Sequence, residues 1–262
     1  MRADDGRDLL VRRDDGRLAV LGDWDGGRVL EAVPAPTGEV LDEAAAQPLP
    51  FVRETAKILC VGLNYRPHIE EMGREAPTHP TLFAKFVDSC IGPADDIARP
   101  ADVDQLDWEG EIALVVGAHV RDEPRETASY AVLGVLALND VTSRGHQYRT
   151  TQWLQGKALD SLTPVGSIVA PLRGDIEITT RVDGEVVQHG SIDELVFGPA
   201  DLVAYASALV RLRPGDIIAT GTPGGVGHGM QPPRHLEPGQ LLETELAGVE
   251  TLRNRIVGAG GA

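Results

Sequence analysis

The stretch "QLDWEGEIALVVG" (105–117) changes from acidic to apolar within a few residues. Its second half is an aliphatic run closed by glycine, which predicts a buried β-strand over 111–117. Because side chains alternate along a strand, Glu109 and Glu111 share one face at the point where this strand begins. The stretch therefore predicts a strand-built core with two carboxylates at its edge.

Two neighbouring carboxylates have two interpretations. If both are ionised at short range, they repel each other by roughly 1 kcal/mol or more. A hard divalent cation removes that cost, and oxygen-only ligands suit magnesium, manganese or calcium. An exposed acidic strand edge is the alternative, and Asp107, on the same face, is a rival ligand.

Acidic residues elsewhere in the chain bear on this choice. Asp140 ends the apolar run "AVLGVLALND" (131–140), a predicted strand, so its side chain emerges at a sheet rim. There it could join Glu109 and Glu111, or it could cap the next turn. The local sequence leaves both open.

His68 and Glu71 lie three residues apart in "YRPHIEEMG" (65–73), a predicted short helix. On a helix they share one face and can form a hydrogen bond, whereas Glu70 points elsewhere. A carboxylate that fixes the tautomer of an imidazole makes the imidazole a positioned general base. An ordinary surface pair is the alternative.

The remaining patterns predict a mostly β protein with a few helices, of the α+β class. It lacks the regular strand–helix alternation of an α/β protein. Further strands are expected over 57–63, 216–221, 240–246 and 250–257, with a hairpin over 176–190 that turns at Asp183-Gly184. Further helices are expected over 125–134, 146–155 and 199–212.

Residues 1–53 form a predicted small β-rich N-terminal domain, and residues 54–262 the catalytic domain. The N-terminal part contains the short alternating pieces "LAVLGDWDG" (18–26) and "RVLEAV" (28–33). A short acidic helix is expected at 41–46, before a polar linker.

Charge and hydropathy exclude several classes of protein. Lys and Arg total 24 against 40 for Asp and Glu, a net charge of −16, which argues against nucleic-acid binding. The longest apolar runs are under half of the roughly 20 residues that a membrane helix needs, and no signal peptide is evident, so a cytoplasmic protein is expected. Cys60 and Cys90 are expected to be buried free thiols. Because the protein is acidic, an anionic substrate would need a local positive charge at its binding site, and a bound cation could provide it.

Lys157 and a glycine-rich loop complete the candidate site. A lone lysine is usually solvated, but Trp153 and Gly156 beside Lys157 indicate a partly enclosed location. The loop "ATGTPGGVGHG" (219–229) lacks the GKS or GKT ending of a phosphate-binding P-loop and a helix after it. A loop whose backbone approaches a ligand, with Thr222 offering a hydroxyl, fits better.

Taken in order, these pieces resemble the fumarylacetoacetate hydrolase family, most closely its bacterial fumarylacetoacetase- or acylpyruvase-like subgroup. The resemblance covers about residues 57–255 and rests on these stretches: "CVGLNYRPHIEEMG", "PTLFAKF", "IGPADDI", "LDWEGEIALVVG", "LNDVTSRGHQ", "QWLQGKALDSLTPVG", "RPGDIIATGTPGGVG" and "LRN". It implies a mixed β-sandwich roll with a small N-terminal domain, a homodimer, and a site dependent on Mg2+ or Mn2+, with Ca2+ as a further option.

The resemblance also assigns roles to individual residues. The implied metal ligands are Glu109, Glu111 and Asp140. The implied catalytic residues are His68, Glu71, Lys157 and Gln147, and the implied substrate-binding residues are Arg144, Thr222, Gly221 and Tyr65.

Several reactions are compatible with such a site. The resemblance implies a hydrolase that cleaves a C–C bond in an acylpyruvate- or fumarylacetoacetate-type oxo-acid through a metal-bound enolate, with the His–Glu dyad activating water. A metal-dependent decarboxylase or isomerase of an oxo-diacid, as in aromatic catabolism, is the alternative, and a biosynthetic or non-catalytic relative is a third. Departures from the family pattern, among them Gly145, His146, Leu63 and Leu159, bear on the substrate and the reaction more than on metal binding.

Overall fold

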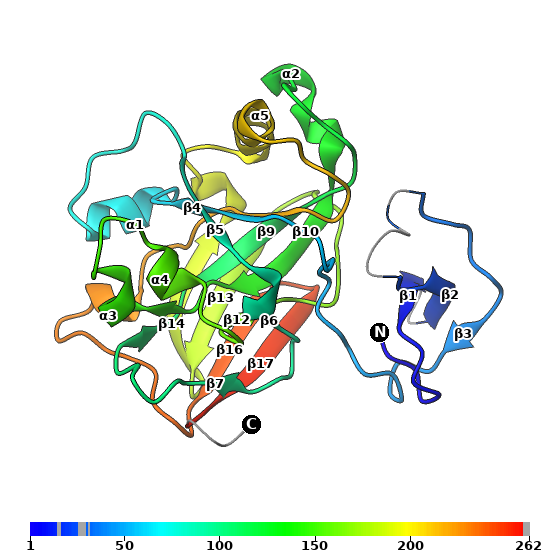
Figure 1. The fold of residues 1–262 in the computed structure, drawn as a ribbon, viewed down its shortest axis with the longest axis horizontal. Coiled ribbons are helices and arrows are strands. Elements are labelled where there is room, and N and C mark those ends of the chain that lie inside the picture. Colours follow the sequence, from blue (N-terminus) through cyan, green and yellow to red (C-terminus); the bar gives the residue numbers. More distant parts are fainter. Residues whose placement is uncertain (15–16, 26–29, 31, 259–262) are drawn as a thin grey trace.

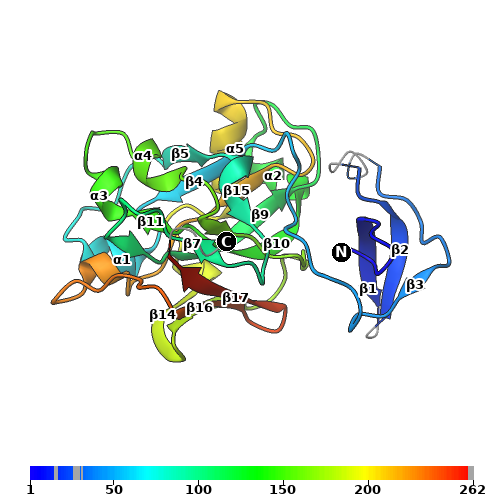
Figure 2. The same cartoon turned by 60° about the horizontal axis from the view of Figure 1, so that its bottom comes forward.

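The computed structural model describes residues 1–14, 17–25, 30 and 32–258. Two five-stranded sheets build the body of the molecule, and a small three-stranded sheet near the N-terminus lies to one side of it (Figure 1). The view in Figure 2, turned by 60°, shows the same separation. This arrangement of mixed sheets with short helices confirms the predicted α+β class.

The first large sheet has the predicted acidic strand near its centre. Its order is β10 (Val132–Asn139), β9 (Gly110–Val116), β15 (Ile217–Ala219), β4 (Ile58–Gly62) and β5 (Thr81–Lys85). Strand β15 runs parallel to β4 and antiparallel to β9, so the sheet is mixed. Every residue of β9 is buried, which explains why the sequence after Glu111 is continuously apolar instead of alternating.

The second large sheet packs against the first and closes the sandwich. Its order is β14 (Glu185–Ser191), β13 (Glu177–Val182), β16 (Leu241–Leu246), β17 (Glu250–Val257) and β7 (Ile97–Ala98). Strands β13 and β16 contact β9 and β10, and residues such as Ile178 and Leu246 join Ile112 in one core cluster. The predicted hairpin turn is confirmed, because Asp183 and Gly184 both have positive φ, at 52° and 83°.

Short elements complete the body. The two-stranded ladders pair β8 (Leu106–Asp107) with β11 (Thr142–Ser143) and β6 (Cys90–Ile91) with β12 (Thr163–Pro164). The helices are α1 (Arg66–Glu71), α2 (Arg125–Ala128), α3 (Arg144–Gln147), α4 (Leu154–Lys157) and α5 (Pro199–Leu209). Helix α5 ends before the predicted residue 212 because Val210 is already extended.

The single helix predicted over 146–155 is wrong, because the structure has α3 and α4 with an irregular segment between them. The hydroxyl of Thr150 accepts from the N–H of Gln152 and donates to its carbonyl. Such local bonds compete with helical ones and favour a break.

In the N-terminal sheet, β1 (Leu9–Asp14) pairs with β2 (Arg17–Asp23), and β2 pairs with β3 (Val40–Leu41). The alternating piece at 18–26 forms β2, as predicted for a small strand, whereas half of the piece at 28–33 (residues 28, 29 and 31) lies outside the described residues. The acidic helix predicted at 41–46 is wrong. There β3 gives way to a turn, in which the Asp42 carboxylate accepts from the N–H of Ala44.

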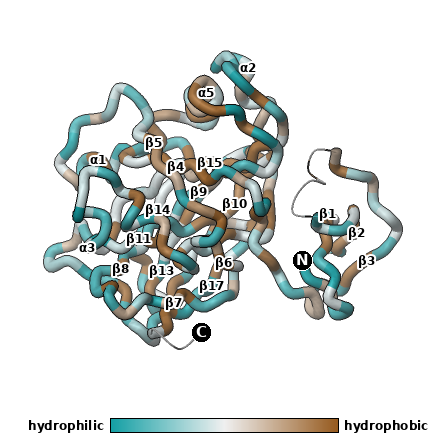
Figure 3. Tube along the Cα trace, in the orientation of Figure 1, coloured by the Kyte–Doolittle hydropathy of each residue, from teal (hydrophilic) through white to brown (hydrophobic). Residues whose placement is uncertain are grey.

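Hydropathy follows this architecture. The interior strands and α5 are largely hydrophobic, whereas the outer loops are mostly hydrophilic (Figure 3). In the described part of the chain, no helix has the length and apolar character needed to cross a bilayer. Both cysteines are free, as predicted, with Cys60 buried and Cys90 partly buried.

Candidate metal centre and active site

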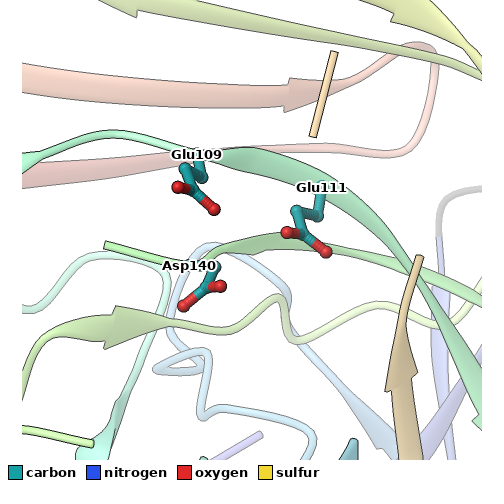
Figure 4. A group of neighbouring side chains, drawn as sticks. All are labelled: Glu109, Glu111 and Asp140. Atoms are coloured by element: carbon teal, nitrogen blue, oxygen red, sulfur yellow. The ribbon is translucent and has the colours of Figure 1, made fainter. Parts of the chain in front are cut away.

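Three carboxylates meet where β9 begins and β10 ends. Asp140 follows the last residue of β10, and its N–H donates to the Glu109 carbonyl over 2.8 Å, which extends the β9–β10 ladder. That register sets Asp140 opposite Glu109, on the face that Glu111 shares. One ligand oxygen from each residue lies within 4.8 Å of the others, and all three residues are buried. Figure 4 shows the three carboxylates directed toward one another.

Glu111 shows most directly that this group suits a divalent cation. Burial raises the pKa of Glu111 well above its ordinary value, and the neighbouring Asp140 and Glu109 add to the rise. Its carboxylate accepts from the N–H of Gly221 over 2.8 Å, and no described cationic side chain forms an ion pair with it. Oxygen ligands of this kind fit Mg2+, Mn2+ or Ca2+.

Lys157 lies between the other two carboxylates. Its Nζ is 2.7 Å from Glu109 Oε2 and 2.7 Å from Asp140 Oδ2, and its side chain is 2% exposed, in agreement with the predicted enclosure. Burial alone would lower the pKa of Lys157, but Asp140 and Glu109 outweigh it and raise the pKa. Burial likewise opposes ionisation of Glu109, yet Lys157 and Arg144 bring its pKa down to about 2. Lys157 is therefore a buried ammonium group.

Lys85, at the end of β5, is a second buried ammonium that the sequence did not single out. Its Nζ donates to Asp140 Oδ1 over 2.7 Å and to the Val141 carbonyl over 3.2 Å. Both side chains of this ion pair are fully buried. The segment "PTLFAKF" contributed to the family resemblance, but a lone lysine at a strand end carries no local signal of its partner.

We expect Lys85→Met to destabilise the metal-free protein by about 3 kcal/mol, because it leaves Asp140 buried with less compensating charge. Added Mn2+ should recover part of this loss, so the variant should show a larger metal-induced rise in Tm than the wild type. Lys57→Met is a matched control, since it removes a more exposed Lys–Asp pair, with Asp216, that does not touch the carboxylates. Its effect should be the same with and without Mn2+ in thermal unfolding, and a similar pattern for Lys85→Met would contradict the prediction.

Asp107 supports its neighbours and is not part of the carboxylate cluster. Its carboxylate accepts from Arg144 Nε over 2.8 Å and from the N–H groups of Gly227 and His228 over 2.8 and 3.0 Å. Arg144 then reaches Glu109 Oε1 over 2.7 Å and Gln147 Oε1 over 2.9 Å. Asp107 thus ties the glycine-rich loop to the arginine that contacts a predicted metal ligand.

Helix α1 carries the predicted dyad. His68 Nδ1 lies 3.1 Å from Glu71 Oε2, and the N–H of Gly225 donates to the same carboxylate. Burial raises the pKa of Glu71, but the hydrogen bonds from His68 and Gly225 outweigh it and lower the pKa. An ionised carboxylate can only accept, so Nδ1 is the donor, and the neutral tautomer with this hydrogen bond has its lone pair on Nε2. Glu70, the rival partner, is exposed.

Five of these side chains, namely Glu109, Glu111, Arg144, Lys157 and His68, line one cavity of about 110 Å³, whereas Asp140 and Glu71 are not on its wall. Its wall contains Val61, Gly62, Leu63, His68, Met72, Arg74, Phe83, Glu109, Glu111, Arg144, Gln147, Tyr148, Trp153, Lys157 and Thr222. Thr222 is held there by Gln188, whose Nε2 donates to its hydroxyl over 2.8 Å. The structure thus brings most of the predicted site residues together.

Two predicted substrate contacts lie elsewhere. Tyr65 is fully buried in the main core cluster, and Gly221 uses its N–H to bind Glu111, so neither is on the cavity wall. A larger cleft of about 600 Å³ runs between the N-terminal strands and the body, but its wall contains none of the predicted site residues.

Three of the departures from the family pattern have different consequences. Gly145 is exposed and off the cavity wall, and a Cβ there would meet nothing closer than 3.7 Å. His146 is also off the wall, with its Nδ1 2.8 Å from the Ser143 hydroxyl. Leu63 does line the cavity, with a left-handed φ of 55°. Of the three, Leu63 is placed to affect the substrate.

Comparisons with known proteins identify relatives of this chain. Residues 57–257 match the family model described as "Fumarylacetoacetate (FAA) hydrolase C-terminal". The chain is 37% identical over 210 residues to human "Oxaloacetate tautomerase FAHD2A, mitochondrial", an alignment that covers 77% of this chain and 66% of the relative. It is 39% identical over 217 residues to "Oxaloacetate tautomerase YisK" of Bacillus subtilis (strain 168), covering 79% and 71%. The chain thus spans slightly less than two thirds of the human relative's length.

Solved structures extend the likeness to nearly the whole chain. A 5-carboxymethyl-2-hydroxymuconate delta-isomerase from Mycobacterium smegmatis superimposes with a TM-score of 0.82 at 33% identity, covering 99% of this chain and 97% of the other. A fumarylpyruvate hydrolase from Pseudomonas aeruginosa, solved with Mn2+ and pyruvate, gives a TM-score of 0.71 at 31% identity, covering 82% and 93%.

Proposed function

The chain belongs to the fumarylacetoacetate hydrolase family, and we propose that it interconverts the enol and keto forms of a small 2-oxo-diacid of the oxaloacetate type. The observation that carries this proposal is His68, oriented by Glu71, on the wall of a cavity of about 110 Å³ that also contains Glu109 and Glu111. Sites for drug-sized ligands measure roughly 300–1,000 Å³. A four-carbon acid suits the smaller volume better than a fumarylacetoacetate-sized substrate does.

Glu109, Glu111 and Asp140 would hold a divalent cation, for which Mg2+ and Mn2+ are our candidates. When bound, it would supply the Lewis acidity that makes a proton beside a 2-oxo group easier to remove. The bound cation would also attract an anionic substrate, which otherwise has to approach a protein of net charge −16.

The chain's own residues then move one proton. His68 takes it at Nε2, because Nδ1 already donates to Glu71, and returns it to the other end of the C–C–O unit. Glu71 stays ionised and stabilises the charged ring while the proton is held. Lys157 and Gln147, both on the cavity wall, would stabilise negative charge that develops on oxygen. Such a cycle needs no water and no bond cleavage between carbons.

C–C hydrolysis of an acylpyruvate is the second candidate. The likeness to a fumarylpyruvate hydrolase solved with pyruvate favours it, and the same dyad could activate water. It requires room for a longer acyl arm and a water molecule, which the small cavity does not favour.

One experiment separates these reactions. Purified protein loaded with Mg2+ is mixed with the enol form of oxaloacetate, and the decay of the enol absorbance is compared with the spontaneous rate. Acylpyruvates and meta-cleavage diacids are assayed in parallel by mass spectrometry. We expect accelerated enol decay with no new carboxylic acid; two acids from a diketo-acid would select hydrolysis, and CO2 release would select decarboxylation.

A further inference from the structure

The cavity wall contains four basic side chains, and three of them already have partners. Arg144 is bound by Asp107 and Glu109, Lys157 by Glu109 and Asp140, and His68 by Glu71. Arg74 differs, since its guanidinium forms no ion pair or hydrogen bond with any residue that the structure describes. Arg74 is exposed and lines the cavity, so its guanidinium group is available to bind a ligand.

Arg74 reaches the cavity because of the way α1 ends. The N–H of Gly73 donates to the Glu70 carbonyl and the N–H of Arg74 to the Ile69 carbonyl, each over 3.0 Å. Gly73 has a φ of 60°, the left-handed conformation with which many helices end. This turn reverses the chain directly after the dyad, so His68, Met72 and Arg74 all contribute to one wall.

We propose that Arg74 binds the far carboxylate of a dicarboxylic oxo-acid whose 2-oxo-acid end lies at the Glu109–Glu111–Asp140 cluster, and that it thereby selects diacids over monoacids. This inference rests on the proposed function for the identity of the substrate. Its physical basis is charge. In an acidic protein, a second carboxylate on the substrate needs a cation that the buried carboxylates have not already neutralised. An arginine can meet a carboxylate with two parallel hydrogen bonds.

The size of the effect follows from the position of Arg74. A charge-assisted bidentate pair is stronger than a neutral hydrogen bond, but an exposed ion pair is weakened by solvent. Roughly tenfold discrimination is the expected outcome. It should shrink as salt is added, because ions screen exposed charges within about 10 Å at 0.1 M ionic strength.

The test compares Arg74→Gln with the wild type on the Mg2+-loaded full chain. We expect KM for oxaloacetate to rise about tenfold with kcat changed less than about twofold, since the lost contact holds the substrate in both its ground and transition states. Binding of pyruvate, which lacks the far carboxylate, should be unchanged in calorimetry. Arg74→Lys, which keeps the charge, should recover part of the KM.

Arg66→Gln is the matched control, because Arg66 is exposed on the same helix but lies outside the cavity wall. It should leave both ligands unaffected. Equal weakening of oxaloacetate and pyruvate by Arg74→Gln, or no change in either, would overturn the role of Arg74. Failure of the proposed function gives a different result: the wild type would bind oxaloacetate more tightly than pyruvate through Arg74, yet would not accelerate its tautomerisation.

Discussion

Replacing Glu111 with glutamine is expected to weaken the binding of Mg2+ or Mn2+ by at least about 100-fold while making the metal-free protein more stable. Loss of a residue that only supports a ligand typically costs 10–100-fold in affinity, and loss of a charged ligand should cost at least as much. The stability gain has a separate origin. Glu111 is buried beside two other carboxylates, so in the folded metal-free protein it must either take up a proton or bear an unfavourable charge, and glutamine removes that cost of roughly 1 kcal/mol or more at neutral pH.

The pKa of Glu111 also sets the direction in which the stability of the metal-free protein depends on pH. Because the pKa of Glu111 is raised in the folded protein, the folded state holds that proton more tightly than the unfolded state does. Its contribution to stability is therefore present at low pH and is lost as pH rises through the folded-state pKa. Glu111→Gln should remove this part of the pH dependence.

The measurements are calorimetric metal titration, and Tm in the presence of EDTA or Mn2+ across pH. The wild type at 100 times its Kd should gain about 2.7 kcal/mol from the metal, whereas the variant should gain far less at the same concentration. Glu70→Gln, an exposed change on α1, serves as the control. Unchanged metal affinity in Glu111→Gln would remove this residue from the ligand set.

Much of this site could be predicted from local sequence because strands have a strict period. The spacing of Glu109 and Glu111 fixes their common face once 111–117 is read as a strand, and Asp140 ends another apolar run. That β9 and β10 are neighbours, with Asp140 opposite Glu109, depends on sheet register. No local pattern contains that register, so the family resemblance supplied the link.

Residues whose role depends on tertiary contacts were harder to predict. Lys85 and Asp107 act through partners distant in sequence, Asp140 and Arg144. The role of Arg74 depends on a turn after α1 and on which other cations are already bound. Strand β1 was missed because its apolar residues lie among arginines, although Leu9 is buried. The boundary after residue 53, the homodimer and the cytoplasmic location stay predictions.

His68→Gln is expected to lower kcat by about 10²–10⁴-fold, the usual contribution of a positioned general acid–base group, while metal affinity stays within about twofold of the wild type. The separation of the two effects follows from the structure. His68 pairs with Glu71 on α1, whereas the predicted metal ligands are anchored by β9, β10, Lys157 and Lys85. Glutamine retains hydrogen-bonding capacity and comparable size but cannot carry the proton between oxygen and carbon.

Glu71→Gln should have a smaller effect on kcat than His68→Gln, because it leaves the imidazole in place and removes the charge that stabilises its protonated form. Since the hydrogen bonds from His68 and Gly225 outweigh burial and lower the pKa of Glu71, the carboxylate stays ionised to lower pH than an ordinary glutamate does. The acid limb of the wild-type pH–rate profile should therefore not reflect an ordinary glutamate. His79→Gln, an exposed histidine off the cavity wall, should change neither kcat nor the profile. If His68→Gln kept kcat within about fivefold of the wild type, proton transfer would have to be assigned to another group on the cavity wall, and Lys157 would be the next candidate.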